Sequence, residues 1–203
     1  MNMIPNQGGA PQPIPGRQVN PAWRSFWRRL LNFALTLAIC LILVFVITQF
    51  VLQRNTVIGS SMTPTLEDRD EIFVEKVTRL FPSALKRGDI VTADTIRGSG
   101  SDEEIVIIKR IVGLPGEHVS IRQGLVYIDG RQLEEPYLDK GVMTREHSSE
   151  YAEVLLGPDQ YYLLGDNRGN SRDSRDIGPV MRQEIEGKLV FRIYPVKRIG
   201  IPK

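Results

Sequence analysis

The sequence predicts a mainly β protein: an antiparallel β-sheet domain with a small inserted cap, behind one N-terminal transmembrane helix. An apolar run without a charged residue covers Leu30–Leu52. Beyond it, short segments rich in β-branched and aromatic residues alternate with Gly, Pro and Asp clusters, which is typical of strands joined by tight turns. The hydrophobic fraction of 41% and the charged fraction of 25% fit one folded domain with accessory segments.

Charge is divided unevenly along the chain. The formal net charge is +2, but residues 1–66 contain arginines and no acidic residue, giving +5, so the remainder carries 2 − 5 = −3. The basic residues are not gathered in the part expected to fold as a domain, which gives no sign of a nucleic-acid partner. The single cysteine, Cys40, excludes a disulfide within the chain.

The N-terminal third is predicted to anchor the protein in a membrane. Residues 1–21 are rich in Pro, Gly, Gln and Asn and should form a disordered cytoplasmic tail. Residues 22–54 hold an aromatic and basic flank and the apolar run, which as a helix spans roughly 34 Å and can cross a bilayer. A cleavable signal peptide is the alternative, but the run is too long and no small-residue cleavage site follows it closely.

Orientation follows from the arginines. Four precede the apolar run, and only Arg54 follows it before the charges become mixed. The positive-inside rule therefore predicts a cytoplasmic N-terminus and places residues 55–203 as a domain on the outer side of the membrane.

The domain is expected to consist of short strands with few helical turns. Gln123-Gly124 and Asp129-Gly130 have the composition of tight hairpin turns. Residues 124–158, beginning with the strand at Leu125, should form the inserted cap, and helical turns are expected only at Leu80–Leu85 and Arg182–Glu186. The predicted strands are 71–77, 90–94, 104–112, 118–121, 125–128, 161–164 and 188–194.

Three segments carry residues with the potential for chemistry. Gly59–Leu66 places small hydroxyl residues before a proline; this usually makes a turn, but it also suits a nucleophilic serine on a rigid loop.

In the strand Ile105–Val112 both faces are apolar apart from one cation each, which suggests burial on both sides. Most strand lysines are solvated, but a buried one has a lowered pKa and can serve as a base. Gly165–Arg175 reads as a surface loop, although loops on a rigid sheet often carry function.

Together these segments resemble the bacterial type I signal peptidases, membrane enzymes that remove signal peptides from exported proteins. Ser61–Leu66 resembles the family's nucleophile motif, Lys109–Gly116 its lysine motif and Gly165–Arg175 its final motif, in the same order behind a basic-flanked anchor. The resemblance covers about 120 residues, from Ile58 to Val180. Family members often have two membrane spans, whereas this chain has one, and its insertion is short.

The resemblance implies a role for each matching residue. Ser61 would be the nucleophile, Lys109 its general base, and Ser171 would orient the lysine amine. A supporting group would comprise Arg110, Asp173, Arg175, Gly165 and Asn167. No metal or other cofactor is implied, and the partners would be membrane lipid and exported preproteins with small residues before the cut, processed at the bacterial plasma (inner) membrane.

The oxyanion region is expected around Gly59, Ser60, Met62 and Pro64. In this family the hole uses the backbone N–H of the nucleophile. Some members add a serine hydroxyl two residues earlier, a position held here by Gly59. We therefore expect a hole built mainly from the main chain.

Rival interpretations depend on other residues. Ser83–Lys86 matches a Ser-x-x-Lys pattern but lacks the companion motifs of the β-lactamases. Neither His118 nor His147 stands near a convincing acidic partner for a catalytic triad, so both are expected to be solvated surface residues. A soluble self-cleaving repressor with a Ser-Lys pair is disfavoured by Leu30–Leu52, and a non-catalytic anchored β domain has no need of a lysine on a buried strand face. No cluster has metal-ligand spacing.

Overall fold

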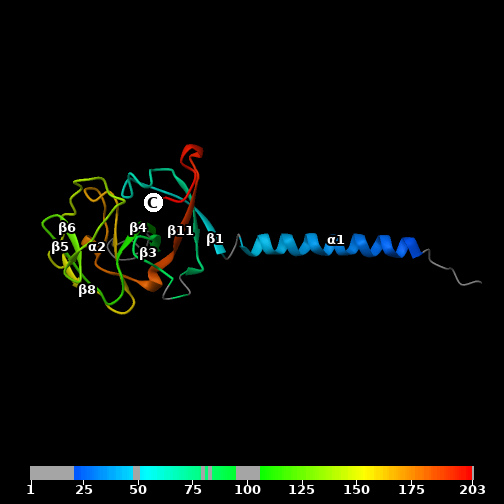
Figure 1. Ribbon diagram of the computed structural model, residues 1–203, viewed down its shortest axis with the longest axis horizontal. Coiled ribbons are helices and arrows are strands. Elements are labelled where there is room, and N and C mark those ends of the chain that lie inside the picture. Colours follow the sequence, from blue (N-terminus) through cyan, green and yellow to red (C-terminus); the bar gives the residue numbers. More distant parts are fainter. Residues whose placement is uncertain (1–20, 48–50, 79–80, 82–83, 95–105, 203) are drawn as a thin grey trace, which may run out of the picture. The chain divides into compact units, whose positions relative to one another are not determined.

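The computed structural model describes residues 21–47, 51–78, 81, 84–94 and 106–202 (Figure 1). Residues up to Phe45 form one compact unit and residues from Val46 onward form another. Residues 1–20 of the predicted tail and the first two residues of the strand predicted at 104–112 lie outside the described residues, as do Leu80, Pro82 and Ser83 of the turn expected at Leu80–Leu85.

The first unit is the helix α1, Pro21–Val46. Its segment Ser25–Val46 is long and apolar enough to cross a membrane by length and composition. The expected helix over Leu30–Leu52 is wrong at its C-terminal end, because Leu52 begins a strand and pairs with Glu75. Hydrogen bonding to a neighbouring strand thus decides the conformation of the last apolar residue.

The second unit contains a seven-stranded sheet in the order β1-β2-β11-β3-β4-β9-β10, with antiparallel neighbours. The short helices α2 (Ser174–Ile177), η3 (Arg182–Glu184) and η4 (Val196–Arg198) lie in its connections and after its last strand. The strands are β1 (Leu52–Thr56), β2 (Glu71–Glu75), β3 (Ile90–Asp94), β4 (Val106–Gly113), β9 (Gln160–Leu164), β10 (Val180–Met181) and β11 (Ile185–Tyr194).

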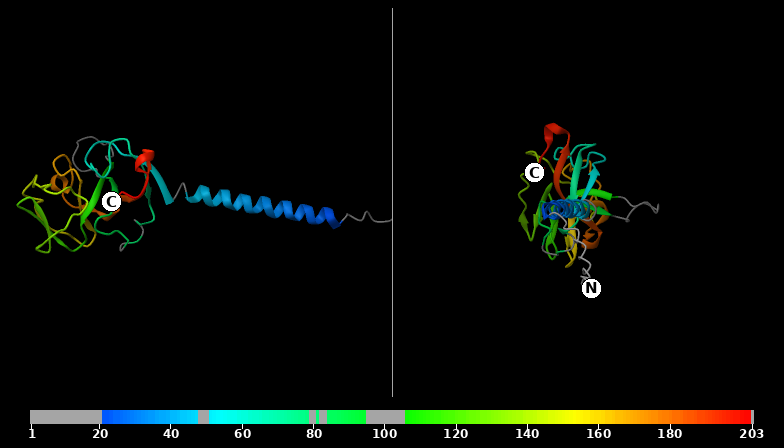
Figure 2. Two further views of the ribbon diagram at one scale, coloured as in Figure 1. Left: turned by 45° about the horizontal axis from the view of Figure 1, so that its top comes forward. Right: turned by 90° about the vertical axis from the view of Figure 1, so that its right-hand side faces the viewer.

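A four-stranded antiparallel sheet in the order β7-β6-β5-β8 forms the other end of this unit (Figures 1 and 2). Its strands are β5 (His118–Arg122), β6 (Leu125–Ile128), β7 (Arg131–Gln132) and β8 (Glu153–Leu155). The sheet begins at His118, before the start expected for the inserted cap. Both predicted hairpin turns are present, with positive φ at Gln123, Gly124, Asp129 and Gly130.

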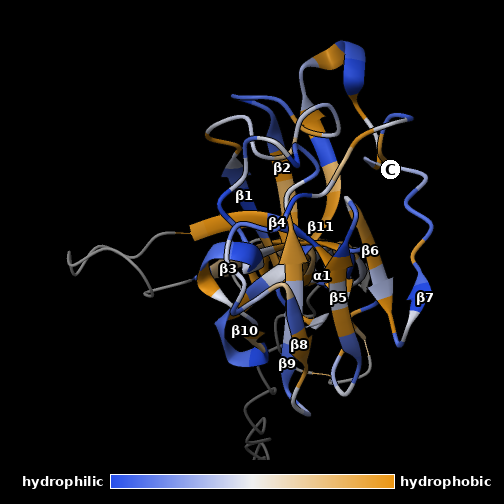
Figure 3. Cartoon of the chain, turned by 90° about the vertical axis from the view of Figure 1, so that its left-hand side faces the viewer, coloured by the Kyte–Doolittle hydropathy of each residue, from blue (hydrophilic) through white to orange (hydrophobic). Residues whose placement is uncertain are grey.

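Three apolar clusters hold the second unit together, and much of its central strands has the colour of hydrophobic residues in Figure 3. One includes Val91, Ile111 and Leu163, from adjacent strands of the large sheet. A second joins that sheet to the small one, since Val112 and Leu164 pack with β5 and β6. The third contains Met62 and Leu66 of the predicted nucleophile motif. The mainly β fold class is confirmed.

Two smaller predictions concern helical turns. Arg182–Glu184 forms a 3₁₀ turn as expected, although Ile185 already belongs to β11. Leu85 is buried in an apolar cluster, as expected if this segment packs inward, whereas Phe81 is 56% exposed. Leu80 lies outside the described residues.

Candidate active site

The loop that carries Ser61 follows the end of β1 and is held in place by buried apolar side chains. Val57, Met62 and Leu66 are buried in one apolar cluster, so the loop cannot lift away without exposing them. Gly59 has a φ of 89°, a conformation that favours glycine, and its N–H donates to Asp68 Oδ1 at 2.8 Å. These contacts hold Ser61 at a defined place beside the sheet.

Lys109 reaches this serine from β4, where it pairs across the sheet with Val91. Its side chain is 4% exposed, and Nζ donates to Ser61 Oγ at 2.8 Å and to the Ile108 carbonyl at 3.0 Å. Burial lowers the pKa of Lys109 to about 8, against the opposing attraction of the Asp173 and Asp166 carboxylates. Near neutral pH the neutral amine is therefore the minor form, but a much larger fraction than for a lysine in water.

A cleft of about 610 Å³ opens over this pair. The end of β1 and the start of β4 form its two sides, and Ser61 and Lys109 both line it. The lining is mostly apolar at β4 and mixed at β1. The residues are Gln53, Asn55, Thr56, Val57, Ile58, Ser61, Met62, Val106, Ile107, Ile108, Lys109 and Glu186.

The segment Gly165–Arg175 holds the serine loop from the other side. The Asn167 backbone N–H donates to the Ser61 carbonyl at 3.0 Å, and its side-chain amide donates to the Ser60 carbonyl and to Thr63 Oγ1 at 3.0 Å each. At Gly165 a Cβ would lie 2.5 Å from the Ser61 carbonyl oxygen, so only glycine allows this approach.

Ser60 makes its own contact away from Lys109, because its hydroxyl accepts from Asn170 Nδ2 at 3.0 Å. Pro64 is exposed on the same loop. The expected oxyanion-region residues Gly59, Ser60, Met62 and Pro64 thus surround Ser61 in sequence and in space. Ser60 and Gly59 are both held by side chains of the domain.

Ser171 is buried in the loop that faces the serine loop, and its Oγ lies close to Gly165. Among the described residues its hydroxyl has no hydrogen-bond partner of normal geometry, and the hydrogen bonds of the Lys109 amine go to Ser61 and Ile108. Ser171 also contributes to lowering the pKa of Asp173. An orienting role for Ser171 toward the lysine stays a prediction.

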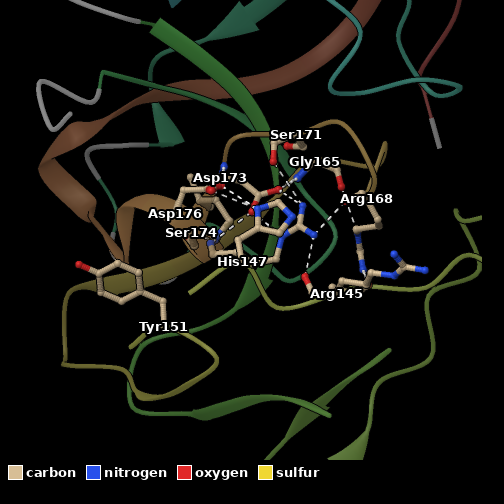
Figure 4. A network of polar contacts seen from close by, with 12 residues as sticks. Arg145, His147, Tyr151, Gly165, Arg168, Ser171, Asp173, Ser174 and Asp176 are labelled. Carbon is tan, nitrogen blue, oxygen red and sulfur yellow. Dashed lines mark hydrogen bonds and ion pairs between the residues drawn. The ribbon is translucent and has the colours of Figure 1, made fainter. Parts of the chain in front are cut away.

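The expected supporting cluster of Arg110, Asp173 and Arg175 is two clusters. Arg110 forms a two-pronged ion pair with Asp166, at 2.9 and 2.6 Å, and donates to the Gly88 carbonyl. Asp173 and Arg175 pair with each other at 2.8 Å through two contacts, both side chains fully buried (Figure 4). Arg110 pairs as it does because β9, which leads into Asp166, lies next to β4 in the sheet.

The Asp173 carboxylate also organises the backbone of its loop. It accepts from the Gly165 N–H at 3.0 Å and caps α2 by accepting from the Arg175 N–H. Burial alone would raise the pKa of Asp173, but the ion pair with Arg175 and the bond from Gly165 hold it below its ordinary value. The carboxylate therefore stays ionised in the folded protein.

A third buried ion pair was not predicted from the sequence. Arg168 is 2% exposed and pairs through both terminal nitrogens with Glu135, and one of them also donates to Thr144. Tyr137 donates to the same glutamate, and its ring lies 4.0 Å from the Arg110 guanidinium. A dense alternation of acidic and basic residues signals such pairing but does not reveal the partners.

Both histidines have acidic neighbours, contrary to expectation. His147 Nδ1 lies 3.1 Å from Asp176, and His118 Nε2 lies 3.2 Å from Glu153. These carboxylates come from segments distant in sequence. Neither histidine has a contact with Ser61, whose described side-chain partner is Lys109. Within the described ranges, no group of three His, Cys, Asp or Glu residues is arranged to hold a metal.

Comparisons with known proteins show which family the chain resembles. The family model described as signal peptidase, peptidase S26, matches residues 30–194. Probable signal peptidase I-2 of Synechocystis is 36% identical over 174 residues, covering 84% of this chain and 76% of the relative. Signal peptidase I T of Bacillus subtilis is 34% identical over 171 residues, covering 81% and 86%.

A crystal structure of a signal peptidase I from Enterococcus faecalis aligns with 52% of this chain and 97% of its own, at 31% identity and a TM-score of 0.43. The family model spans most of α1 and nearly all of the β unit, including the three motifs, Ser61 and Lys109. The chain therefore belongs to the signal peptidase family, peptidase S26, and is a serine peptidase.

Proposed function

We propose that this protein cleaves signal peptides from exported preproteins with a Ser-Lys dyad and an acyl-enzyme intermediate. Family membership supports a serine peptidase that acts on preproteins bearing signal peptides. The observation that carries the finer proposal is the 2.8 Å contact between Lys109 Nζ and Ser61 Oγ, at a place where burial lowers the lysine pKa. A neutral amine there is a suitable general base.

The proposed reaction has two steps. Ser61 Oγ attacks the carbonyl carbon of the residue before the cut while the neutral amine of Lys109 takes the hydroxyl proton. The tetrahedral intermediate collapses, the C–N bond breaks, and the lysine ammonium gives its proton to the leaving amine. Water, deprotonated by the same amine, then hydrolyses the acyl-Ser61 ester.

Charge that develops on the carbonyl oxygen needs hydrogen-bond donors. The backbone N–H of Ser61 is the proposed main donor, because Gly59 has no side chain and the Ser60 hydroxyl is engaged with Asn170. One such donor contributes about 3 kcal/mol of transition-state stabilisation. The contacts of Asn167 support this role, because its hydrogen bonds to the Ser60 and Ser61 carbonyls restrain the backbone around the serine. Gly165 allows the close approach of this segment to the Ser61 carbonyl.

Processing of a preprotein tests the proposal directly. The purified full chain in detergent should convert a preprotein to its mature length, and Ser61→Ala should reduce the rate by at least about a thousandfold, since a nucleophile and its base act as a unit. Gel mobility and the N-terminal sequence of the product are the readouts. Equal processing by wild type and Ser61→Ala would refute Ser61 as the nucleophile.

Substrate shape gives a second prediction. We propose that the residues before the cut bind as an extended strand in the 610 Å³ cleft between β1 and β4, with small residues at the first and third positions before the cut. A tryptophan directly before the cut should prevent cleavage, because its ring exceeds the space beside Ser61. Processing of matched preproteins that carry alanine or tryptophan there measures the effect. Equal rates would reject the pocket.

Topology gives a third prediction. We propose that the protein lies in the bacterial plasma membrane with residues 1–29 in the cytoplasm and residues 55–203 on the outer face, where the domain meets membrane lipid. Protease added to cells whose outer barriers have been removed should digest the domain and leave the N-terminal tail intact. Epitope tags at the two ends report both outcomes, and a digested tail beside an intact domain would reverse the orientation.

A further inference from the structure

We propose that a second groove, beside the serine loop, binds the first residues of the mature chain, those that follow the cut. This inference rests on the proposed function of Ser61 and extends it to the part of the preprotein that is released. It assigns substrate contacts to the segment Leu138–His147, called here the strap, which belongs to the inserted cap.

The groove has a volume of about 790 Å³ and two walls of different origin. One wall is the serine loop and the segment after β9, and the other is the strap. An extended peptide advances about 3.3 Å per residue, so a groove of this volume has room for several residues. The lining residues are Thr63, Pro64, Leu138, Asp139, Gly141, Val142, Met143, Arg145, Glu146, His147, Asp166, Asn167, Arg168 and Gly169.

Continuity with the active site identifies the occupant. Ser61 and Met62 line the first cleft, and the next two residues, Thr63 and Pro64, line this groove. Asn167 joins the two places, because it binds the Ser61 and Ser60 carbonyls and Thr63 Oγ1 while lining the groove itself. If the preprotein residues before the cut lie in the first cleft, the residues after the cut must run past the serine loop and away from that cleft.

The groove is held open by contacts that do not involve a ligand. Asp166 and Arg168, both buried, are already neutralised by Arg110 and Glu135. The strap is tied to the segment after β9 by the 3.1 Å contact of His147 with Asp176 and by Arg175, whose guanidinium donates to the Arg145 carbonyl at 3.1 Å (Figure 4). A preformed groove of this kind binds a peptide with little loss of its own conformational freedom.

The exposed part of the strap determines what the groove accepts. Met143 and Val142 both line the groove and are 61% and 38% exposed, so its lining includes apolar surface that is open to solvent. An extended mature chain covers this surface and places alternate side chains against it. A charge introduced at residue 143 should therefore discriminate between charged residues after the cut.

Reciprocal charge variants test the assignment in the full chain. Met143→Glu and Met143→Lys are compared with wild type on matched preproteins that carry Lys or Glu at the second, third or fourth position after the cut. Met143→Glu should favour the Lys substrate by about threefold to tenfold in kcat/KM relative to wild type, and Met143→Lys should favour the Glu substrate similarly. The dependence on residues before the cut should not change.

Two controls separate the possible outcomes. Gln132→Glu adds one negative charge to the exposed strand β7 of the inserted cap, outside both the strap and the groove lining, so it should leave the preference unchanged. Cleavage by wild type with none by Ser61→Ala establishes the proposed function independently. If that holds, folded Met143 variants with unchanged preference after the cut, or with altered preference only before it, would overturn the groove assignment. Absence of cleavage by wild type would overturn both proposals.

Discussion

Lys109→Arg is expected to abolish cleavage while the protein still folds. Arginine keeps the positive charge but cannot act as a base, because its pKa exceeds about 12. General-base catalysis contributes about 10²–10⁴ in rate, so the loss should be at least of that size. Single-turnover cleavage of a preprotein, with folding checked by near-ultraviolet circular dichroism, measures it. Lys109→Met is the matched second variant, because it removes the buried charge, keeps the length and should be equally inactive.

The pH dependence of the wild type follows from the same lysine. Burial lowers the pKa of Lys109 to about 8, so the reactive neutral amine is the minor form below that pH and the major form above it. The rate constant for cleavage should rise with pH and level off above about 8, whereas an unperturbed lysine would carry the rise to about 10.4. His118→Ala and His147→Ala should show the same profile as wild type. A dead histidine variant, or an active and folded Lys109→Arg, would end the Ser-Lys assignment.

Asp173→Ala is expected to destabilise the protein by about 3–5 kcal/mol, because it leaves the Arg175 guanidinium buried without its partner. The same change removes acceptors for the Gly165 and Arg175 N–H groups. Thermal unfolding of the full chain in detergent, followed by near-ultraviolet circular dichroism, reports the loss. Glu71→Gln breaks the exposed ion pair with Arg54 and should change stability by less than about 1 kcal/mol.

A double variant distinguishes loss of an ion pair from general damage. Asp173→Ala combined with Arg175→Met removes both charges and should recover part of the stability lost in Asp173→Ala. A double variant less stable than the single one would contradict the explanation by an unpaired charge.

Low pH should weaken the ion pair between Asp173 and Arg175. The folded-state pKa of Asp173 lies below its ordinary value, so the unfolded chain binds the proton more readily over this range. The contribution of Asp173 to stability is therefore complete above the ordinary carboxyl pKa and is lost as the pH falls through the folded-state value. Asp173→Ala should show a flatter decline in melting temperature over that acid range than wild type.

Features that depend on local physical chemistry could be predicted from the amino-acid sequence. The length of the apolar run predicts a helix able to span a membrane, and α1 covers most of it. The strand at Ile90–Asp94 and the turns at Gln123-Gly124 and Asp129-Gly130 follow from β-branched residues and from residues that tolerate positive φ. The order of the three motifs was enough to indicate the family. None of these features requires knowledge of which strands are neighbours.

Which charged side chains pair with one another could be seen only in the folded chain. Arg110 and Asp166 are 56 residues apart, and they pair because the sheet places β9 beside β4. Asp173, expected beside Arg110, instead pairs with Arg175 two residues away. Glu135 reaches Arg168 from the inserted cap, 33 residues earlier in the chain. Leu52 is a strand residue for a similar reason, since pairing with β2 outweighs its membership in an apolar run. The Arg110–Asp166 and Arg168–Glu135 pairs and the edge strand at Leu52 depend on neighbours distant in sequence, which a local sequence pattern does not reveal.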